Sequence, residues 1–361
     1  MPFLTNFLKR ILYGFAVLLG VVTLIFFLFN VLPGDPALMM VGQRADMASV
    51  EGIRKELGLD KPIYLQYIRY LNDLSPVSFH QSVKQDSYFY FDAEKYKSAF
   101  VVFSTSGGFT LALKVPWLGR SFQSHRPVGE MISEAFPNTL ILALAAITIA
   151  FFLGTFLGTF SALMKDSWYD RGAIFFSALG MSIPSFFAAI LIAWFFAYKI
   201  GHITHLNLTG NLYEIDDFGR GIRLQLKNLI LPAFTLGIRP LSVVVQLSRN
   251  SMLEVLNQDY IRTAYAKGLR KTRIIGVHAL RNSLNPVVTA ISGWFASMLA
   301  GVVFVEYIFG WRGLGYMLVN ALNFYDLPVV LGCVLTTSVI FVIVNISMDV
   351  TYALLDPRIR K

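Results

Sequence analysis

The most visible pattern along the chain is a series of long apolar runs separated by polar segments. Each run approaches the roughly 20 apolar residues that a helix needs to cross a bilayer. The six runs cover residues 11–32, 139–164, 172–198, 229–247, 286–305 and 328–354. The pattern therefore predicts an all-α membrane protein with six transmembrane helices.

Glycine and proline occur inside several of these runs. Gly154, Gly158 and Gly180 have no side chain, which favours close contact between membrane helices. Pro184, in the segment "GMSIPSFF", lacks a backbone N–H, so it predicts a kink in the third span. We interpret all four residues as packing features.

The longest polar segment, residues 33–137, lies between the first and second runs. Residues 48–74 have the pattern of two short helices that are broken at 59–62. Residues 86–115 are rich in aromatic and β-branched side chains and contain a Gly-Gly pair. These features predict at least two strands and a turn. We therefore expect a small mixed subdomain outside the membrane.

Composition and charge support a membrane protein and predict its orientation. The chain is 55% hydrophobic and 15% charged, with a mean hydropathy of +0.57. With the N-terminus inside, the cytoplasmic segments carry fourteen Lys or Arg against five acidic residues, and this excess equals the formal net charge of +9. The positive-inside rule then predicts that both termini are cytoplasmic. The basic pI requires no nucleic-acid partner.

The cytoplasmic loop 248–285 is basic and too polar to lie in lipid. Its periodicity predicts one helix near Met252–Lys267 and another near Lys271–Asn282, divided by Gly268. Tyr260, Ala264 and Gly268 are spaced four apart, so they would share one helix face. The small members of that face would let another surface approach the backbone.

Three interpretations of this loop compete. A basic amphipathic hairpin could lie on the lipid headgroups, as the positive-inside rule would allow. Alternatively, the loop could be a docking element for a cytoplasmic partner. Contact with nucleic acid is disfavoured because the loop is tied to the membrane at both ends. Physical chemistry alone leaves the first two open.

The segments "RTAYAKGL" and "HALRNSLNPVV" resemble the cytoplasmic loop of binding-protein-dependent ATP-binding cassette (ABC) importer permeases. The resemblance is to the dipeptide, oligopeptide and nickel branch. It extends to "FNVLPGDPA", "RPVGEMISEAFPNTLILA", "VEYIFGWRGLGYMLVNALNFYDLPVVLG" and "DVTYALLDPRIR". Arg262 and Thr263 stand where the wider family has Glu-Ala, and Arg312 stands where the branch often has Pro. Residues 79–116 are longer than the branch leads us to expect.

The resemblance implies a type I ABC importer permease fold, in which helices two to six form the transport core. It divides the chain into an anchor helix (1–32), a periplasmic segment (33–137) and a core (138–361). In this family the loop forms a coupling helix that binds a groove of a cytoplasmic ATPase. The residues that match this coupling element are Tyr260, Arg262, Thr263, Ala264, Lys267, Gly268 and Leu269.

The resemblance also implies partners: a homologous second permease, two cytoplasmic ATPase subunits and an extracytoplasmic substrate-binding protein. It implies a bacterial inner membrane and the import of peptides or similar small solutes by alternating access. The chain has no GxxxxGK[ST] phosphate-binding loop. ATP and Mg²⁺ would therefore bind to the partner ATPases, and we expect no cofactor, metal site or catalytic residue in this chain.

Polar residues within the spans are candidates for lining the pore, although many such residues only form hydrogen bonds between helices. The pore-lining candidates are Ser182, Ser185, Ser292, Ser297 and Asn345. Glu306, at the outer end of the fifth span, is expected to anchor a loop.

Two other functional classes are disfavoured. A secondary transporter driven by an ion gradient usually needs ionisable residues inside the membrane. The spans contain few: Asp349, which we expect to pair with a C-terminal Arg, and Arg239, which could lie where two permeases meet. A membrane-embedded enzyme is disfavoured because the sequence has neither an HExxH motif nor a pair of Asp within the spans.

Overall fold

The computed structural model describes residues 2–30, 50–52, 54, 59–83, 87–93, 95–96, 99–215 and 221–355. The "LPGDPA" segment, the closing "DPRIR" and the side chain of Asp349 lie outside what is described, so the predictions for them stay predictions. The chain forms two compact units. The first unit comprises Met1–Gly14, Glu134–Val319 and Thr337–Lys361, and the second comprises Phe15–Ser133 and Asn320–Thr336.

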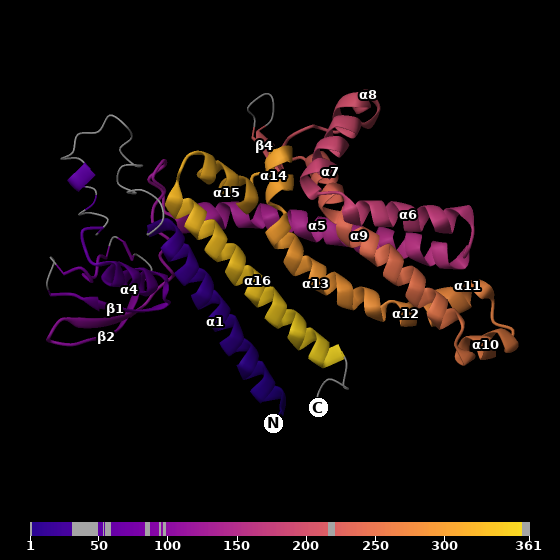
Figure 1. The fold of residues 1–361 in the computed structure, drawn as a ribbon, viewed down its shortest axis with the longest axis horizontal. Coiled ribbons are helices and arrows are strands. Elements are labelled where there is room, and N and C mark those ends of the chain that lie inside the picture. Colours follow the sequence, from indigo (N-terminus) through magenta and orange to yellow (C-terminus); the bar gives the residue numbers. More distant parts are fainter. Residues whose placement is uncertain are drawn as a thin grey trace. The chain divides into compact units, whose positions relative to one another are not determined.

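Four of the predicted spans form long continuous helices (Figure 1). These helices are α1 (Pro2–Asn30), α5 (Val128–Leu163), α9 (Lys227–Leu256) and α16 (Leu327–Leu355). Their apolar segments are long enough to cross a bilayer. The helical membrane architecture predicted from the apolar runs is confirmed for these four.

The third predicted span is not one continuous helix. It consists of α6 (Trp168–Ser182) and α7 (Ser185–Ile192), which continues as the π-helix η1 (Ala193–Lys199). The two halves are bent by 113°. The predicted kink is confirmed, because Pro184 has no N–H to continue the ladder, and it and Ile183 adopt extended backbone (ψ 138° and 128°). The predicted span over 172–198 is therefore a bent pair of helices, with a sharper bend than an ordinary kink.

The fifth predicted span is also interrupted. Helix α13 (Asn285–Gly301) is 17 residues long and ends before Val302, and α14 (Val303–Phe309) follows. The described residues therefore hold four long spanning helices and one bent pair. They do not contain six continuous ones. The other elements that follow α5 are α8 (Gly201–Thr204), β4 (Tyr213–Ile215), β5 (Ile222–Leu224) and α15 (Leu314–Asn323).

Glycines in the first unit let α5 and α6 approach α9 closely, as predicted. A Cβ added at Gly154 would lie 2.7 Å from Val244 Cγ1, so only glycine fits there. Gly158 lies against the backbone of Val245, and Gly180 lies against Ser242. A buried core extends over α5, α7, α9, α13 and α14 and includes Trp311. Close helix contact therefore positions the three helices on which the functional site depends.

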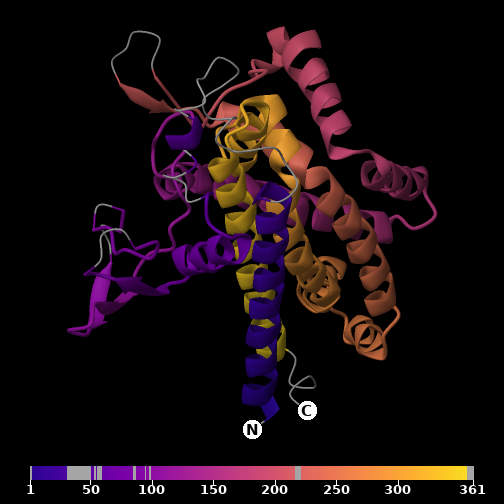
Figure 2. The same ribbon diagram turned by 60° about the vertical axis from the view of Figure 1, so that its left-hand side comes forward.

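Helices α1 and α16 contact one another where Gly14 faces Val342. A Cβ at Gly14 would lie 2.8 Å from Val342 Cγ1. The beginning of α1 and the end of α16 lie at the same end of the first unit in both ribbon views (Figure 1, Figure 2). This arrangement agrees with two termini on one side of a membrane.

The second unit contains α4 (Ile63–Leu74) and the strands β1 (Val77–Gln81), β2 (Phe100–Ser104) and β3 (Phe109–Leu113). The strands form an antiparallel sheet in the order β1-β3-β2. The predicted strand–turn–strand is confirmed as β2 and β3, with Gly108 at φ +85° in the turn. The second of the two predicted short helices is confirmed as α4. The location of this subdomain outside the membrane stays a prediction.

Strand β1 lies outside residues 86–115, for which strands were predicted, and its buried face is polar. Ser78 and His80 face inward and are buried, whereas Val77 and Phe79 are exposed. Ser78 Oγ donates to the carbonyl of Ala112 on β3 (3.3 Å) and lies 2.9 Å from His80 Nε2. The apolar–polar alternation of this segment is that of a strand, but the sequence does not indicate that the polar face is the buried one.

We predict that the sheet loses stability in mild acid. Burial, and after it the Lys114 ammonium, lowers the pKa of His80 to about 4. An unfolded histidine titrates near 6.5, so the unfolded sheet binds the extra proton first, and stability falls as the pH drops from about 6.5 to about 4. Between pH 7 and pH 5 the loss should reach about 2 kcal/mol.

Hydrogen exchange of the β1 and β3 amides in the purified full chain, corrected for intrinsic rates, measures this loss. His80→Phe should remove the pH dependence, because it leaves no titrating group in the sheet. His202→Gln is the matched control because His202 is exposed in α8. Persistence of the acid effect in His80→Phe would show that another group is responsible.

Candidate functional site

The predicted coupling loop begins where α9 ends. Helix α9 continues past the predicted span to Leu256, and after a turn the chain forms α10 (Asp259–Ala266). Then follow α11 (Lys271–Arg273), the π-helix η2 (Ile274–Ala279) and α12 (Leu280–Ser283). The break at Gly268 is as predicted, but the single helix predicted over Met252–Lys267 is wrong. The turn at Asn257 and Gln258 divides it.

The turn exists because one face of α10 packs back against the chain. Ile261 and Ala264 belong to a buried cluster with Met252 of α9, Ile274 and Ala279 of η2 and Ala162 of α5. Only 7% of Ala264 is exposed. The small side chain of Ala264 therefore contacts the protein's own core, and the coupling role predicted for this residue stays a prediction.

The opposite face of α10 is open to solvent. The exposed members of the predicted coupling set are Tyr260, Arg262, Thr263, Lys267 and Gly268, and Leu269 is half-buried. The Tyr260 hydroxyl accepts a hydrogen bond from Asn282 Nδ2 (2.8 Å), which links α10 to α12. Arg262 Nη1 lies 3.4 Å from Asp259 Oδ1, but both side chains are solvated, so this pair contributes little. The loop thus presents a basic, aromatic surface on a packed base.

Gly268 ends α10 in a Schellman motif. Its N–H donates to the carbonyl of Tyr265 (2.9 Å), and the N–H of Leu269 donates to the carbonyl of Ala264 (3.3 Å). Gly268 has φ +73°, a conformation that glycine adopts without strain. An added Cβ would meet no atom within 4 Å. The left-handed backbone conformation therefore explains why this position is glycine. Close approach of another part of this chain does not explain it.

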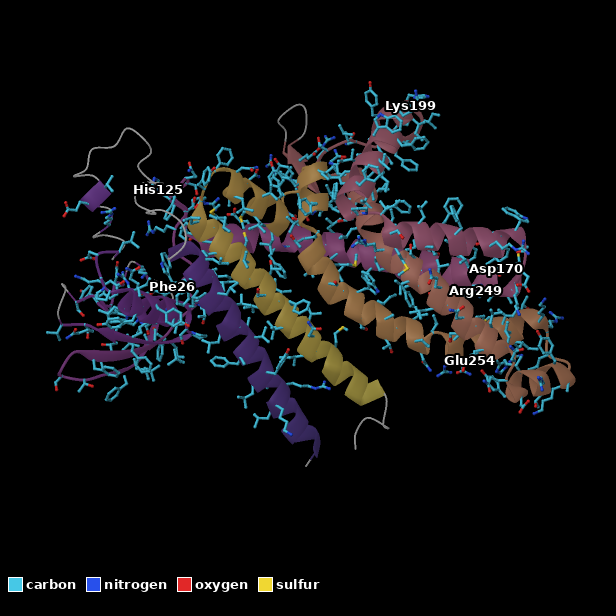
Figure 3. All side chains as sticks on the ribbon, viewed as in Figure 1. Phe26, His125, Asp170, Lys199, Arg249 and Glu254 are labelled. Atoms are coloured by element: carbon cyan, nitrogen blue, oxygen red, sulfur yellow. The ribbon has the colours of Figure 1, made fainter. Side chains whose placement is uncertain are left out.

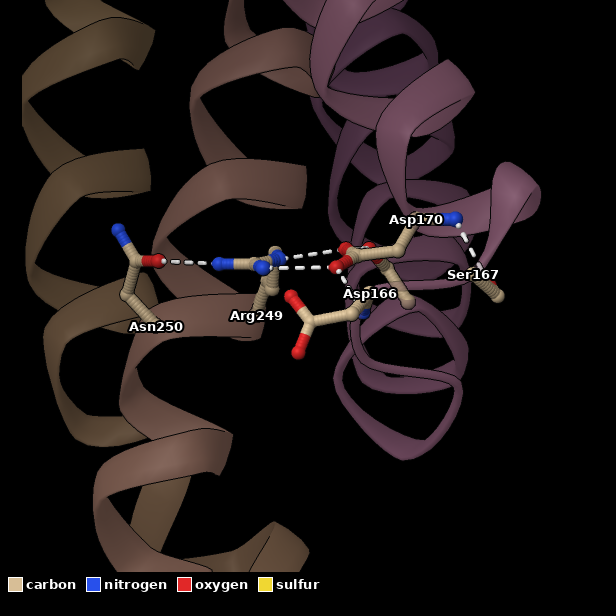
Figure 4. Close-up of polar contacts among 6 residues, drawn as sticks. Asp166, Ser167, Asp170, Arg249 and Asn250 are labelled. Atoms are coloured by element: carbon tan, nitrogen blue, oxygen red, sulfur yellow. Dashed lines mark hydrogen bonds and ion pairs between the residues drawn. The ribbon is translucent and has the colours of Figure 1, made fainter.

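A buried ion pair joins α6 to α9 above this loop. Asp170 and Arg249 project toward each other from the two helices (Figure 3). Arg249 Nε donates to Asp170 Oδ1 (2.6 Å) and Nη2 donates to Oδ2 (2.7 Å), so the pair is bidentate. The Asp170 side chain is 2% exposed and also accepts from Ser161 Oγ and from the Asp166 N–H (3.0 Å) (Figure 4). The carboxylate is therefore saturated with donors.

The sequence offered only a weak signal for this pair. Ser167 caps α6 and accepts a hydrogen bond from the Asp170 N–H (3.2 Å), so the "SWYD" segment looks like an ordinary helix start. Arg249 lies seven residues before the end of α9. The pair therefore links the α5–α6 turn to the end of the helix that carries the coupling loop.

The five pore-lining candidates divide into two groups. Three bond to carbonyls of their own helices: Ser182 to Ala178 (2.9 Å), Ser292 to Val288 (2.8 Å) and Asn345 to Phe341 (2.8 Å). Ser185 and Ser297 instead line a cavity of about 140 Å³ where α7, α9 and α13 meet. The structure brings only these two together, and a pore-lining role for all five stays a prediction.

Glu306 holds the loop that follows α14. It is fully buried, and its carboxylate accepts hydrogen bonds from Thr139 Oγ1 (2.7 Å) and from the N–H groups of Gly315 (2.7 Å) and Tyr316 (3.1 Å). The indole of Trp311, in the same loop, donates to the carbonyl of Asn138 (2.9 Å). These contacts agree with the anchoring role expected for Glu306.

Comparison with known proteins extends over almost the whole chain. Residues 154–361 match the family model "Binding-protein-dependent transport system inner membrane component", and residues 3–85 match its N-terminal counterpart. The chain is 36% identical over 353 residues to a putative peptide transport system permease protein of Brucella abortus, covering 98% of each chain. It is 33% identical to the di/tripeptide transport system permease protein DppB of Pseudomonas aeruginosa (94% of each). It is also 31% identical to the glutathione transport system permease protein GsiC of Salmonella paratyphi A (98% of each).

We predict that Gly268→Ala loosens the end of α10 by about 1 kcal/mol, since alanine is disfavoured in the left-handed region. Hydrogen exchange of residues 259–269 in the purified chain measures this change. Gly276→Ala is the matched control: a Cβ added at Gly276 would also meet no atom within 4 Å, and Gly276 lacks the positive φ. Equal effects of the two substitutions would contradict the conformational explanation.

We predict that Asp170→Asn destabilises the chain by about 3 kcal/mol, because it leaves the Arg249 charge without its carboxylate. Thermal unfolding in detergent measures the loss. Asp166→Asn makes the same chemical change on an exposed side chain four residues away, so it should have little effect. Adding Arg249→Met to Asp170→Asn should recover part of the loss. Additive losses would show that the two residues do not act as a pair.

Proposed function

We propose that this chain, which belongs to the family of binding-protein-dependent transport system inner membrane components, couples ATP hydrolysis on separate subunits to solute import through its α10 loop. It is a permease of an ABC importer of the peptide branch. It is a multi-pass protein of the inner membrane. The proposal concerns how its parts perform this activity.

The observation that carries the proposal is the two-sided construction of α10. Its inner face, Ile261 and Ala264, packs on the cluster that includes Met252 of α9. Its outer face offers Arg262, Thr263 and Lys267 to solvent. A push on the exposed face would therefore be transmitted to α9 through a packed contact, because close-packed groups do not compress. This construction supports docking of a cytoplasmic ATPase over a hairpin that merely lies on headgroups.

The Asp170–Arg249 pair would extend this transmission to α6. It joins the end of α9 to the α5–α6 turn through two hydrogen bonds. Closure of two ATPases on ATP would move α10, and α9 and α6 would follow as one body. The bent α6–α7 pair would then shift at the cavity beside Ser185 and change access to it.

The proposed assembly contains this chain, a homologous second permease, two ATPase subunits and an extracytoplasmic substrate-binding protein. The absence of a GxxxxGK[ST] loop supports ATP and Mg²⁺ sites on the ATPase subunits, with no catalysis by this chain alone. We propose six spans: the four long helices, the bent α6–α7 pair, and α13 together with α14. We also propose cytoplasmic termini and the division into residues 1–32, 33–137 and 138–361.

The proposed cargo is a short peptide. The relatives whose names state a substrate are named for dipeptides, for di- and tripeptides and for glutathione. All of these molecules carry carboxylates and amide carbonyls. Family membership does not favour the alternative, a secondary transporter driven by an ion gradient.

We predict that Arg262→Glu weakens association with the ATPase about tenfold. The substitution reverses the charge of an exposed residue on the proposed docking surface, so a complementary charge on the ATPase would be repelled. Co-purification from native membranes in mild detergent, quantified against the sister permease, measures the effect. Arg273→Glu is the control: it makes the same charge reversal on an exposed residue of the same loop, outside α10. Equal losses would favour the headgroup hairpin, and no loss in either variant would exclude docking through α10.

A further inference from the structure

A cavity of about 140 Å³ lies beside the bend between α6 and α7. It is enclosed by residues of α6, α7, α9 and α13. Its polar lining residues are Ser185, Thr235, Arg239, Trp294 and Ser297. A cavity of ~150 Å³ holds a molecule the size of benzene, so this one has room for a carboxylate and a short side chain. We call it the donor cavity because its polar lining side chains can all donate hydrogen bonds.

Four of these side chains have hydrogen-bonding groups without partners in the described part of the chain; Arg239 and Ser297 are exposed, and Ser185 and Trp294 are half-buried. Among the residues that the structure describes, the hydroxyls of Ser185 and Ser297, the indole N–H of Trp294 and the guanidinium of Arg239 make no hydrogen bond or ion pair. The fifth, Thr235, donates its hydroxyl to the carbonyl of Leu231 (2.7 Å) and is already satisfied.

The unpartnered groups share one chemistry. Arginine and the indole N–H only donate, and serine hydroxyls can donate. Among the residues that the structure describes, no Asp or Glu lines the cavity to balance the positive charge of Arg239. Because arginine stays charged in proteins, neutralisation by loss of a proton is not available to it. The cavity therefore selects a ligand that accepts hydrogen bonds and carries negative charge.

The position of Arg239 strengthens this conclusion. It lies within α9, one of the long apolar helices, where an unpaired charge facing lipid would cost several kcal/mol. Pro240 follows Arg239 directly in α9, and both residues line the cavity beside the bend between α6 and α7. Charged residues at such depth usually face a water-filled path or a substrate. Guanidinium pairs with carboxylate through two parallel hydrogen bonds.

We propose that the donor cavity binds the C-terminal carboxylate of the transported peptide, with Arg239 as the charged partner and Ser185, Ser297 and Trp294 as additional donors. The site rests on the proposed function, since it presumes that peptides pass through this chain. It assigns the permease a selectivity of its own, for cargo with a free carboxylate. Import would thus include a substrate-selective step within the membrane, at the cavity beside the bend of α6 and α7.

The test uses the complete transporter, reconstituted in proteoliposomes with its binding protein. ATP-dependent uptake of trialanine is compared with uptake of trialanine C-terminal amide, each at a concentration that saturates the binding protein. Wild type should import the free acid about tenfold faster than the amide, the value expected from one charged hydrogen-bonding contact. Arg239→Gln should bring the two rates within twofold, because it removes the charged partner of the carboxylate.

Two further variants separate cargo contact from general damage. Ser297→Ala removes one donor and should lower the ratio of acid to amide uptake severalfold. Thr235→Val removes a hydroxyl that lines the same cavity but already bonds within α9, so the ratio should not change. The same lipids are present in the measurements with the free acid and with the amide. If Arg239 bound a lipid phosphate and not the peptide, the two peptides would therefore be imported at similar rates.

Each other outcome overturns the proposal. An unchanged ratio in Arg239→Gln would show that Arg239 does not contact the carboxylate. Loss of the sister permease from purified Arg239→Gln, together with an unchanged ratio in Ser297→Ala, would assign Arg239 to a contact between subunits. Absence of ATP-dependent uptake of either peptide by wild type would instead overturn peptide import itself, and the site with it.

Discussion

A chain that lies in lipid must satisfy its own polar groups, because no water is present to do so. Most of this structure follows from that constraint. Hydroxyls such as those of Ser182, Ser292 and Thr235 bond to carbonyls of their own helices. The charged groups Asp170 and Arg249 saturate one another at the end of α9. Around the donor cavity, by contrast, the described residues supply no acceptor for Arg239, Ser185, Ser297 or Trp294, and two of these side chains, Arg239 and Ser297, are exposed.

Helix α9 connects the features that the function requires. It carries Arg239 at the donor cavity, Arg249 in the ion pair and, after one turn, α10 with its proposed docking surface. Within α9, the 17 residues from Arg239 to Leu256 rise roughly 26 Å at 1.5 Å per residue. Close contact at Gly154 and Gly158 attaches α5 to the same helix. A displacement at the loop would therefore reach the cavity as motion of a packed body, without a separate relay of side chains.

Sequence reasoning succeeded where local chemistry decides the structure. Hydropathy located the spanning helices, glycine located the close contacts, and Pro184 located the bend, because each effect depends on only a few neighbouring residues. It failed where distant residues decide. Strand β1 buries Ser78 because β3 offers it a carbonyl acceptor, and Ala264 faces inward because Met252 and Ile274 lie behind it. Gly268 was identified as a break, but its role as a left-handed cap required the geometry of α10.

By itself, the sequence determined that this chain is a basic, multi-pass ABC importer permease of the peptide branch with a basic helical loop, because apolar run length, positive charge and motif are properties of contiguous residues. Only the tertiary structure decided which polar groups are satisfied. Asp170 and Arg249 are 79 positions apart, and Ser185 and Ser297 are further apart still. Whether such groups bond to one another or remain open for a ligand depends on how the helices pack. No local sequence pattern encodes how close in space two residues so far apart in the chain will lie.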